Sequence, residues 1–301
     1  MSRALVLGAG GFVGAHLCAR LAADGWDVVG TVRPGSPPAA RHPAVEQVPV
    51  ELADPAALAT AVRAADPDVA FHLAASRLRD DAAGRTVTAA VNTLSGLHLV
   101  EALPDRCRAV IRLGSSTEYA AVDGPMAEDA PLRPRGFFGA TKAAGSLLLT
   151  AAAAERDIRS VVLRAFQVYG PRDHLTRLVP TVVRAARDGT VLPLTGPGLR
   201  RDWVYVADVV EACVLAAGAD RLATGSVLNV GTGVQTANEE LVALVEQVSG
   251  RTVSVASGAY ENRSWDTGSW GCDPSAAREL LGWEPTTDLV TGLRRCWEAG
   301  S

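Results

Sequence analysis

The chain has 301 residues, a formal net charge of −4, 48% hydrophobic residues and 21% charged residues. This composition is typical of a globular protein and excludes a disordered or collagen-like chain. The length allows one large α/β domain, or one domain with a smaller lobe attached. No basic run stands out, which argues against binding to a nucleic acid polymer or to an anionic membrane.

The five cysteines are odd in number and widely scattered, and no histidine stands at metal-ligand spacing from them. The sequence therefore predicts reduced cysteines, no disulfide framework and no metal site. The apolar stretch 143–154 is expected to be too short to span a membrane. Because the N-terminus also lacks the pattern of a signal peptide, we expect a cytoplasmic location.

Short β-rich runs alternate with helix-like stretches over the first half of the chain. Strands are predicted at residues 3–7, 27–32, 69–73, 109–113 and 160–166. Helices are predicted at residues 12–23, 56–65, about 86–103 and 138–155. Strands that alternate with helices pair in parallel through right-handed crossovers, so the pattern predicts an α/β fold with a doubly wound parallel sheet of the Rossmann type.

Beyond about residue 170, prolines and glycines divide the chain into shorter elements. Strands or loops leading into helices are predicted at 200–210 and 226–233, and helices at 274–281 and 289–298. We expect residues 1–169 to form a dinucleotide-binding Rossmann domain. Residues 170–301 are expected to form mainly a smaller C-terminal α/β lobe that binds the substrate, with some segments returning to the first domain.

A glycine-rich turn follows the first predicted strand directly. Gly8, Gly11 and Gly14 stand at Gly-x-x-Gly-x-x-Gly spacing and open the first predicted helix. These glycines permit a tight turn, close approach of a pyrophosphate and close packing of helix on strand, and the helix N-terminus then faces the phosphates. The pattern predicts a dinucleotide site that also includes Phe12 and Val13.

The end of the second predicted strand favours one cofactor over another. A free ribose 2′-hydroxyl is usually met there by an acidic residue, whereas this chain has Thr31, Val32 and Arg33. Arginine suits a 2′-phosphate, so we expect NADP(H), with NAD(H) as the alternative. The competing interpretation is that Arg33 is only a solvated loop residue.

The chain contains 29 lysines and arginines together, and Lys142 is the single lysine among them. A lysine kept in so arginine-rich a chain is expected to do what a guanidinium cannot, such as present a compact ammonium group or lower the pKa of a neighbouring group.

Several further clusters share one family pattern. They are Phe71-His72-Leu73-Ala74-Ala75, Asn92-Thr93-Leu94-Ser95-Gly96, Gly114-Ser115-Ser116-Thr117-Glu118-Tyr119, Phe138-Gly139-Ala140-Thr141-Lys142, Arg164-Ala165-Phe166-Gln167-Val168-Tyr169-Gly170-Pro171 and Arg200-Arg201-Asp202-Trp203-Val204-Tyr205. With this spacing the chain resembles, over nearly its whole length, the extended short-chain dehydrogenase/reductase family, in particular its NAD(P)-dependent nucleotide-sugar epimerases, dehydratases and ketoreductases.

The resemblance implies a catalytic Tyr-x-x-x-Lys pair and a serine or threonine. Lys142 matches the lysine, Ser115 or Ser116 matches the hydroxyl residue, and Phe138 stands where the family has tyrosine. A phenyl ring neither donates nor accepts a proton. Phe138 is therefore interpreted in three ways: as an engineered substitution, as a natural variant whose proton comes from Ser115, Ser116, Tyr119 or water, or as the mark of a chain that has lost redox chemistry.

The resemblance also implies the remaining contacts. Cofactor contacts are expected from Glu51, Leu52, Leu73, Ala74, Ala75, Asn92 and Lys142, and substrate contacts from Ser115, Gln167, Arg201 and Arg263. Glu118 is interpreted either as the proton-abstracting base of a 4,6-dehydratase or, preferably, as an ordinary loop carboxylate. A homodimer is expected from the same resemblance.

The function expected from these residues is an NADPH-dependent ketoreductase acting on a nucleoside diphosphate 4-keto-6-deoxysugar. The alternatives are a nucleotide-sugar 4-epimerase, a 4,6-dehydratase, and a catalytically impaired or non-enzymatic dinucleotide-binding relative. Arg33 favours the reductase because epimerases and dehydratases recycle a tightly held cofactor, usually NAD.

Overall fold

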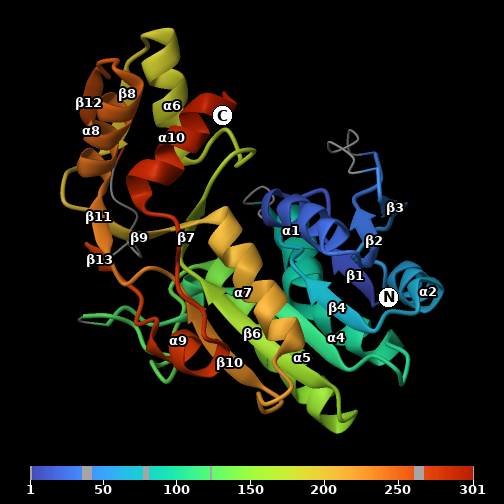
Figure 1. Ribbon diagram of the computed structural model, residues 1–301. Helices are drawn as coiled ribbons and strands as arrows, with labels where there is room; N and C mark the ends of the chain where they lie inside the picture. The colour runs from blue at the N-terminus through green and yellow to red at the C-terminus, as the bar shows by residue number, and fades with distance from the viewer. Residues whose placement is uncertain (1, 36–42, 77–80, 123, 261–267, 301) are drawn as a thin grey trace.

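The computed structural model describes residues 2–35, 43–76, 81–122, 124–260 and 268–300 (Figure 1). Its main sheet has seven strands, all parallel, in the order β10-β6-β5-β4-β1-β2-β3. The strands are β1 (Arg3–Leu7), β2 (Asp27–Val32), β3 (Val45–Pro49), β4 (Val69–His72), β5 (Ala109–Ser115), β6 (Arg159–Ala165) and β10 (Ser226–Val230). The predicted doubly wound parallel sheet is confirmed.

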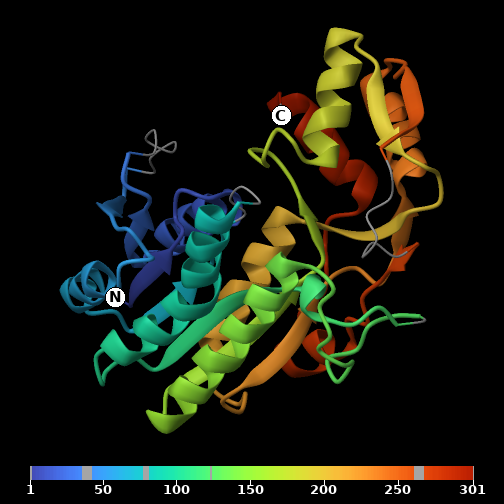
Figure 2. The same cartoon turned by 180° about the vertical axis from the view of Figure 1, so that it is seen from behind.

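Helices cover both faces of this sheet. One face is covered by α1 (Phe12–Ala23) and α7 (Val206–Gly218), which pack against each other in the view of Figure 1. The other is covered by α2 (Pro55–Ala65), α4 (Ser95–Ala102) and α5 (Phe137–Glu155), of which α4 and α5 lie in front when the molecule is seen from behind (Figure 2). Apolar residues buried on both faces explain why the central strands read as continuous hydrophobic runs.

A second group of elements lies beyond the carboxyl ends of the main strands (Figure 1). Its sheets join β7 (Gln167–Tyr169), β9 (Arg200–Tyr205), β11 (Gln235–Ala237) and β13 (Ser269–Trp270), and separately β8 (Leu192–Thr195) and β12 (Val255–Tyr260). Its helices are α6 (Leu178–Asp188), α8 (Asn238–Ser249) and α10 (Leu289–Ala299), while α9 (Ser275–Leu281) packs near β10. Strand β10 belongs to the main sheet although it follows this group's first elements in sequence. The boundary after residue 169 stays a prediction.

The structure differs from the expected elements in several places, and it contains helices α6 and α8, which were not predicted. Strand β3 was not predicted, because its segment 45–49 is only partly buried at the sheet edge and carries Glu46 and Gln47. The helix expected over 86–103 begins earlier, as α3 (Ala82–Ala89), and is divided by a π-helical turn, Ala90–Leu94, before α4. Periodicity locates helical segments but does not detect a wider turn within one.

The expectation that the apolar stretch 143–154 is too short to span a membrane is wrong, because the helix that contains this stretch is longer. Helix α5 has 19 residues and passes that test by length and composition, because it begins several residues before the apolar stretch 143–154. In the structure α5 packs on β5, β6 and α4 as a core helix of the sheet. All five cysteines are buried, and the described residues contain no disulfide.

Candidate active site

The glycine-rich loop lies at the carboxyl edge of the sheet, between β1 and α1. Gly8 has φ of +90°, and a Cβ atom there would lie 2.8 Å from the backbone nitrogen of Ala74. A Cβ on Gly14 would lie 2.1 Å from the Gly8 carbonyl oxygen. Helix α1 begins after Gly11 with no side chain capping it. The amides of its first turn, from Phe12 to Gly14, therefore fit an anion such as a dinucleotide pyrophosphate.

The ends of β2 and β3 lie next to this loop. Arg33 follows β2 and is exposed to solvent. The Val50 amide donates to the Val32 carbonyl at 2.9 Å, which brings Glu51 and Leu52 beside the end of β2. A Cβ on Gly10 would lie 3.4 Å from Val32, so this edge also borders the glycine loop. The arrangement fits the adenosine end of a dinucleotide.

Asn92 connects the loop after β4 to helix α5. Its side-chain amide accepts from the Ser76 amide at 2.7 Å and donates to the Ser76 carbonyl and to Thr141 Oγ1, both at 3.0 Å. Leu73, Ala74 and Ala75 immediately precede Ser76, and Thr141 immediately precedes Lys142. The expected cofactor contacts from three separate segments are thus brought to one place.

Lys142 and Ser115 lie at the carboxyl end of β5. The buried Lys142 Nζ donates to the Leu113 carbonyl at 2.5 Å, two residues before Ser115. Ser115 is half-buried, and its Oγ lies 2.8 Å from Thr117 Oγ1. Ser116 begins a 3-10 turn, Ser116–Glu118, and is buried. Of the two serines that the sequence left open, Ser115 is therefore the one more accessible to a substrate.

Phe138 lies in the first turn of α5, one helical turn before Lys142. A Cβ on the adjacent Gly139 would lie 2.2 Å from the Thr117 carbonyl oxygen, so this turn of the helix contacts the 3-10 turn directly. Phe138 is half-buried. The region of Phe138, Ser115 and Lys142 is thereby assembled around the ends of β5 and α5.

Glu118 and Tyr119 are committed to contacts within the protein. The fully buried Glu118 accepts from the Ser115 amide at 2.9 Å and forms an ion pair with Arg164 at 3.1 Å. The Tyr119 hydroxyl donates to Asn229 Oδ1 at 2.7 Å, and burial raises the pKa of Tyr119 to about 12. Tyr119 is therefore a poor candidate for a proton donor, and Glu118 is a buried, ion-paired carboxylate rather than an ordinary loop residue.

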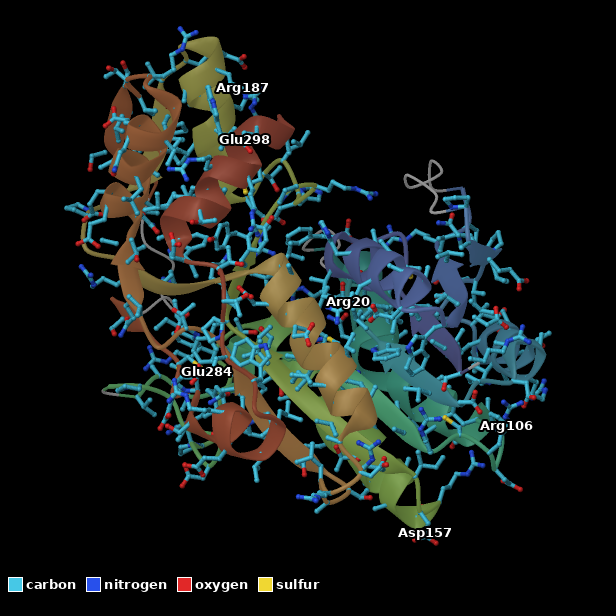
Figure 3. All side chains as sticks on the ribbon, in the orientation of Figure 1. Arg20, Arg106, Asp157, Arg187, Glu284 and Glu298 are labelled. Carbon is cyan, nitrogen blue, oxygen red and sulfur yellow. The ribbon has the colours of Figure 1, made fainter. Side chains whose placement is uncertain are left out.

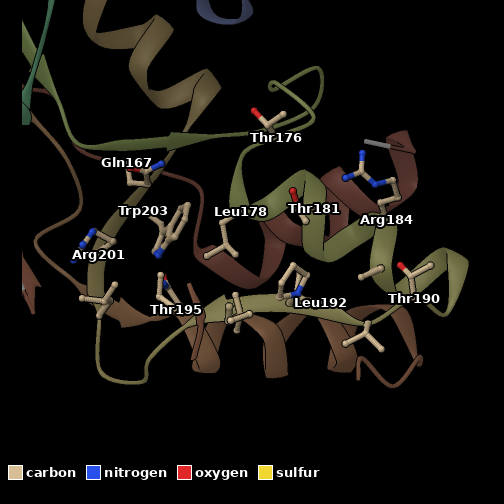
Figure 4. A pocket seen from close by; sticks show the side chains of 17 residues that line it. Gln167, Thr176, Leu178, Thr181, Arg184, Thr190, Leu192, Thr195, Arg201 and Trp203 are labelled. Carbon is tan, nitrogen blue, oxygen red and sulfur yellow. The ribbon is translucent and has the colours of Figure 1, made fainter. Parts of the chain in front are cut away.

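A cavity of about 1030 Å³ opens in the second group of elements (Figure 4). Gln167, Arg201 and Trp203 lie at one end of it, and Arg184 and Thr190 lie at the other (Figure 4). The buried Trp203 Nε1 has no hydrogen-bond partner among the described residues. A cavity with an arginine and a spare indole donor fits an oxygen-rich ligand such as a nucleoside diphosphate.

Sequence reasoning did not single out Arg184, since an arginine on an exposed helix face carries no local signal. Arg263, expected to contact the substrate, lies outside the described residues.

The sequence profile of the NAD dependent epimerase/dehydratase family matches residues 4–231. The chain belongs to this family. Its resemblance to the extended short-chain dehydrogenases is thus confirmed, and its relatives in that family are nucleotide-sugar epimerases, 4,6-dehydratases and a 4-dehydrogenase.

Curated relatives that cover almost the whole chain include an epimerase and a dehydrogenase. UDP-glucose 4-epimerase of Mycolicibacterium smegmatis is 32% identical over 98% of this chain and 97% of its own length. dTDP-6-deoxy-L-talose 4-dehydrogenase (NAD(P)(+)) of Kitasatospora kifunensis is 30% identical over 100% of this chain and 96% of its own. Relatives that match this chain over nearly its whole length thus include both an epimerase and a dehydrogenase.

Solved structures of the family share the fold. MoeE5 in complex with UDP-glucose and NAD is 30% identical, with a TM-score of 0.88 over 99% of this chain and 98% of its own. A tyrosine-to-phenylalanine mutant of Bacillus cereus UDP-glucuronic acid 4-epimerase, in complex with a fluorinated substrate analogue and NAD, is 25% identical, with a TM-score of 0.88 over 99% of this chain and 98% of its own.

Proposed function

We propose that this chain is an NADPH-dependent ketoreductase acting on a nucleoside diphosphate 4-keto-6-deoxysugar. The observation that carries the proposal is Arg33, exposed at the end of β2 where an acidic residue would favour NAD. A reductase must exchange its cofactor after each turnover, which suits a cytoplasmic enzyme using NADPH. The 4-dehydrogenase relative, whose name includes both NAD and NADP, supports the same class of reaction.

The bonding of Glu118 weighs against the 4,6-dehydratase alternative. A base that removes a proton from a sugar carbon must reach that carbon. The Glu118 carboxylate instead lies fully buried between Arg164, the Ser115 amide and Ser146. The 4-epimerase alternative stays the second candidate, because the relative of similar coverage from Mycolicibacterium smegmatis is a UDP-glucose 4-epimerase.

In the proposed reaction, the nicotinamide supplies hydride to the sugar carbonyl carbon when it is bound. Lys142 holds the ribose and nicotinamide end against the ends of β4 and β5, and the buried Asn92 keeps Ser76 and Thr141 in place beside that site. The Ser115 hydroxyl donates a hydrogen bond to the carbonyl oxygen, and water supplies the proton that this oxygen takes up, leaving hydroxide in the solvent. Arg201, Gln167 and the Trp203 indole bind the nucleoside diphosphate in the cavity. Because Phe138 cannot supply a proton, we expect the reduction to turn over slowly.

We also propose that the protein is a homodimer that associates through α5. Leu147 and Leu148 are exposed on this helix, and Leu94 is exposed in the adjoining π-helical turn. Helices α4 and α5 pack side by side, so these apolar side chains belong to adjoining elements. Exposed apolar patches of this kind mark association surfaces.

Arg33→Ala is expected to weaken NADPH binding by about tenfold or more while leaving the affinity for NADH nearly unchanged. The reason is that only the 2′-phosphate of NADPH gains a charge-assisted hydrogen bond from this guanidinium. Fluorescence titration of both reduced cofactors measures the ratio. Arg63→Ala, on the distant helix α2, is the matched control for a lost surface charge. Tighter binding of NADH than of NADPH by the wild type, or an unchanged ratio in Arg33→Ala, would contradict the cofactor assignment.

A further inference from the structure

Arg112 is a buried charge that the proposed reaction does not use. It lies in the middle of β5 between the apolar residues Ile111 and Leu113, and none of its surface is exposed. A buried charged side chain is rare because leaving water is costly unless every polar atom finds a partner. Helices α4 and α5 cover Arg112. Its role is therefore set by the groups that it bonds within the protein.

The guanidinium donates to four acceptors in three separate segments: β4, the π-helical turn and α5. Nε donates to Ser146 Oγ at 3.2 Å, and Nη1 donates to His72 Nδ1 at 3.3 Å. Nη2 donates to the Asn92 carbonyl at 2.6 Å and to the Lys142 carbonyl at 3.5 Å. None of these four acceptors is a carboxylate. The arginine thus acts as a planar set of donors rather than as one half of an ion pair.

His72 fixes the direction of the bonds on one side. Burial, together with the charges of Arg112 and Lys142, lowers the pKa of His72 well below its usual value, so the ring is neutral. Because Nδ1 accepts from Arg112, the proton lies on Nε2, which donates to Ser95 Oγ at 2.7 Å. Ser95 Oγ in turn donates to the Val91 carbonyl at 2.6 Å. The Asn92 carbonyl of the π-helical turn is thus bonded directly to Arg112 of β5. The Val91 carbonyl is bonded to Ser95, which His72 of β4 fixes in turn.

Two glycines leave room for the guanidinium. A Cβ atom on Gly145 of α5 would lie 2.4 Å from Arg112 Nη2, and one on Gly96 of α4 would lie 3.1 Å from Nη1. Any larger residue at Gly145 would also overlap the Asn92 carbonyl, at 2.1 Å. The two helices are thus shaped around this one side chain.

We propose that Arg112 is a positioning residue that holds the π-helical turn and the backbone of Lys142 in the geometry required for cofactor binding. The guanidinium holds the main chain of Asn92, and the Asn92 side chain holds Ser76 and Thr141. It also holds the main chain of Lys142 directly. The inference rests on the proposed roles of Asn92 and Lys142 at the cofactor.

The test compares Arg112→Met with Arg159→Met. Arg159 is the control: it is a buried arginine on the neighbouring strand β6 that donates to the Ala216, Ala217 and Ala219 carbonyls at the end of α7, and it also forms an ion pair with the exposed Asp220 at 3.3 Å. Both variants exchange a buried guanidinium for an apolar side chain of similar length. Hydrogen exchange of the amides in segments 90–96 and 141–146 and NADPH titration by fluorescence are measured on each full-length protein.

In Arg112→Met we expect hydrogen exchange of those amides to become at least about tenfold faster and the NADPH dissociation constant to rise about tenfold. The reason is that the Asn92 and Lys142 carbonyls both lose the guanidinium as their donor. Arg159→Met is expected to change neither quantity. Equal behaviour of the two variants would overturn the proposal. Faster exchange with unchanged NADPH affinity would overturn its functional part.

Arg112→Lys separates hydrogen bonding from packing. An ammonium group still donates to the Asn92 carbonyl but does not reproduce the planar fork, so an affinity between those of wild type and Arg112→Met is expected. An affinity no better than that of Arg112→Met would contradict the hydrogen-bonding role. If the wild type binds no dinucleotide at all, the proposed function is wrong, whereas the exchange comparison still decides whether Arg112 holds the π-helical turn.

Discussion

Replacing Phe138 with tyrosine is expected to raise the turnover of a nucleotide-linked 4-keto sugar by about 10²–10⁴-fold, which is the usual contribution of a positioned general acid. The new hydroxyl would stand one helical turn before Lys142, whose ammonium charge lowers the pKa of a neighbouring phenol. The first turn of α5 already contacts the segment that carries Ser115 and Thr117. Substrate affinity is expected to change little, since the ring itself is retained.

Phe137→Tyr is the matched control for this gain. Phe137 precedes Phe138 in the same turn and is 46% exposed, so a hydroxyl there meets solvent and is expected to leave turnover unchanged. Single-turnover oxidation of NADPH, followed by absorbance, measures all three proteins. Equal rates for wild type and Phe138→Tyr, together with loss of activity in Ser115→Ala, would mean that another group already supplies the proton.

Replacing Glu118 with glutamine is expected to lower the free energy of unfolding by about 3–5 kcal/mol, the usual cost of removing one partner from a buried ion pair. The Glu118 and Arg164 side chains are 0% and 5% exposed, so Arg164 would be left as a buried charge without its carboxylate. The glutamine amide would also place donors opposite the guanidinium. Urea denaturation monitored by circular dichroism measures the loss.

Glu284→Gln is the control for removing a paired carboxylate at the surface, where Glu284 lies (Figure 3). Its ion pair with Arg278 joins side chains that are 61% and 54% exposed, so the expected cost is at most about 1 kcal/mol. Adding Arg164→Met to Glu118→Gln is expected to restore part of the stability, because no unpaired buried charge remains. Equal losses in Glu118→Gln and Glu284→Gln would show that the buried pair contributes little.

The features that the sequence predicted correctly are those with a local signature. The apolar runs of the central strands and the glycines between β1 and α1 each follow from a periodicity or from a backbone requirement within a few residues. The topology then places the loops after β1, β4 and β5 at one edge, because parallel strands all end on the same side of the sheet. The cofactor contacts expected for these residues stay predictions until binding is measured.

The features that the sequence did not reveal depend on contacts between distant segments. Glu118 was interpreted as a base or as an ordinary loop carboxylate, and neither interpretation foresaw its buried ion pair with Arg164, 46 residues later. Arg112 carried one weak signal, a charge inside an apolar strand, but its role depends on Gly96, Gly145 and a π-helical turn. Strand β3 was missed because an edge strand is only partly buried and so lacks the hydrophobic pattern of the others.

The transfer of deuterium from cofactor to sugar tests the proposed reduction most directly. Wild-type protein and Phe138→Tyr, at concentrations equal to the substrate, are mixed with NADPH deuterated at C4 of the nicotinamide and with a nucleoside diphosphate 4-keto-6-deoxysugar. We expect deuterium at C4 of the sugar and one oxidised NADPH for each sugar reduced, with faster transfer in Phe138→Tyr. A sugar isomerised or dehydrated without consumption of NADPH, or cofactor bound with no change in any nucleotide sugar, would contradict the assignment as a ketoreductase.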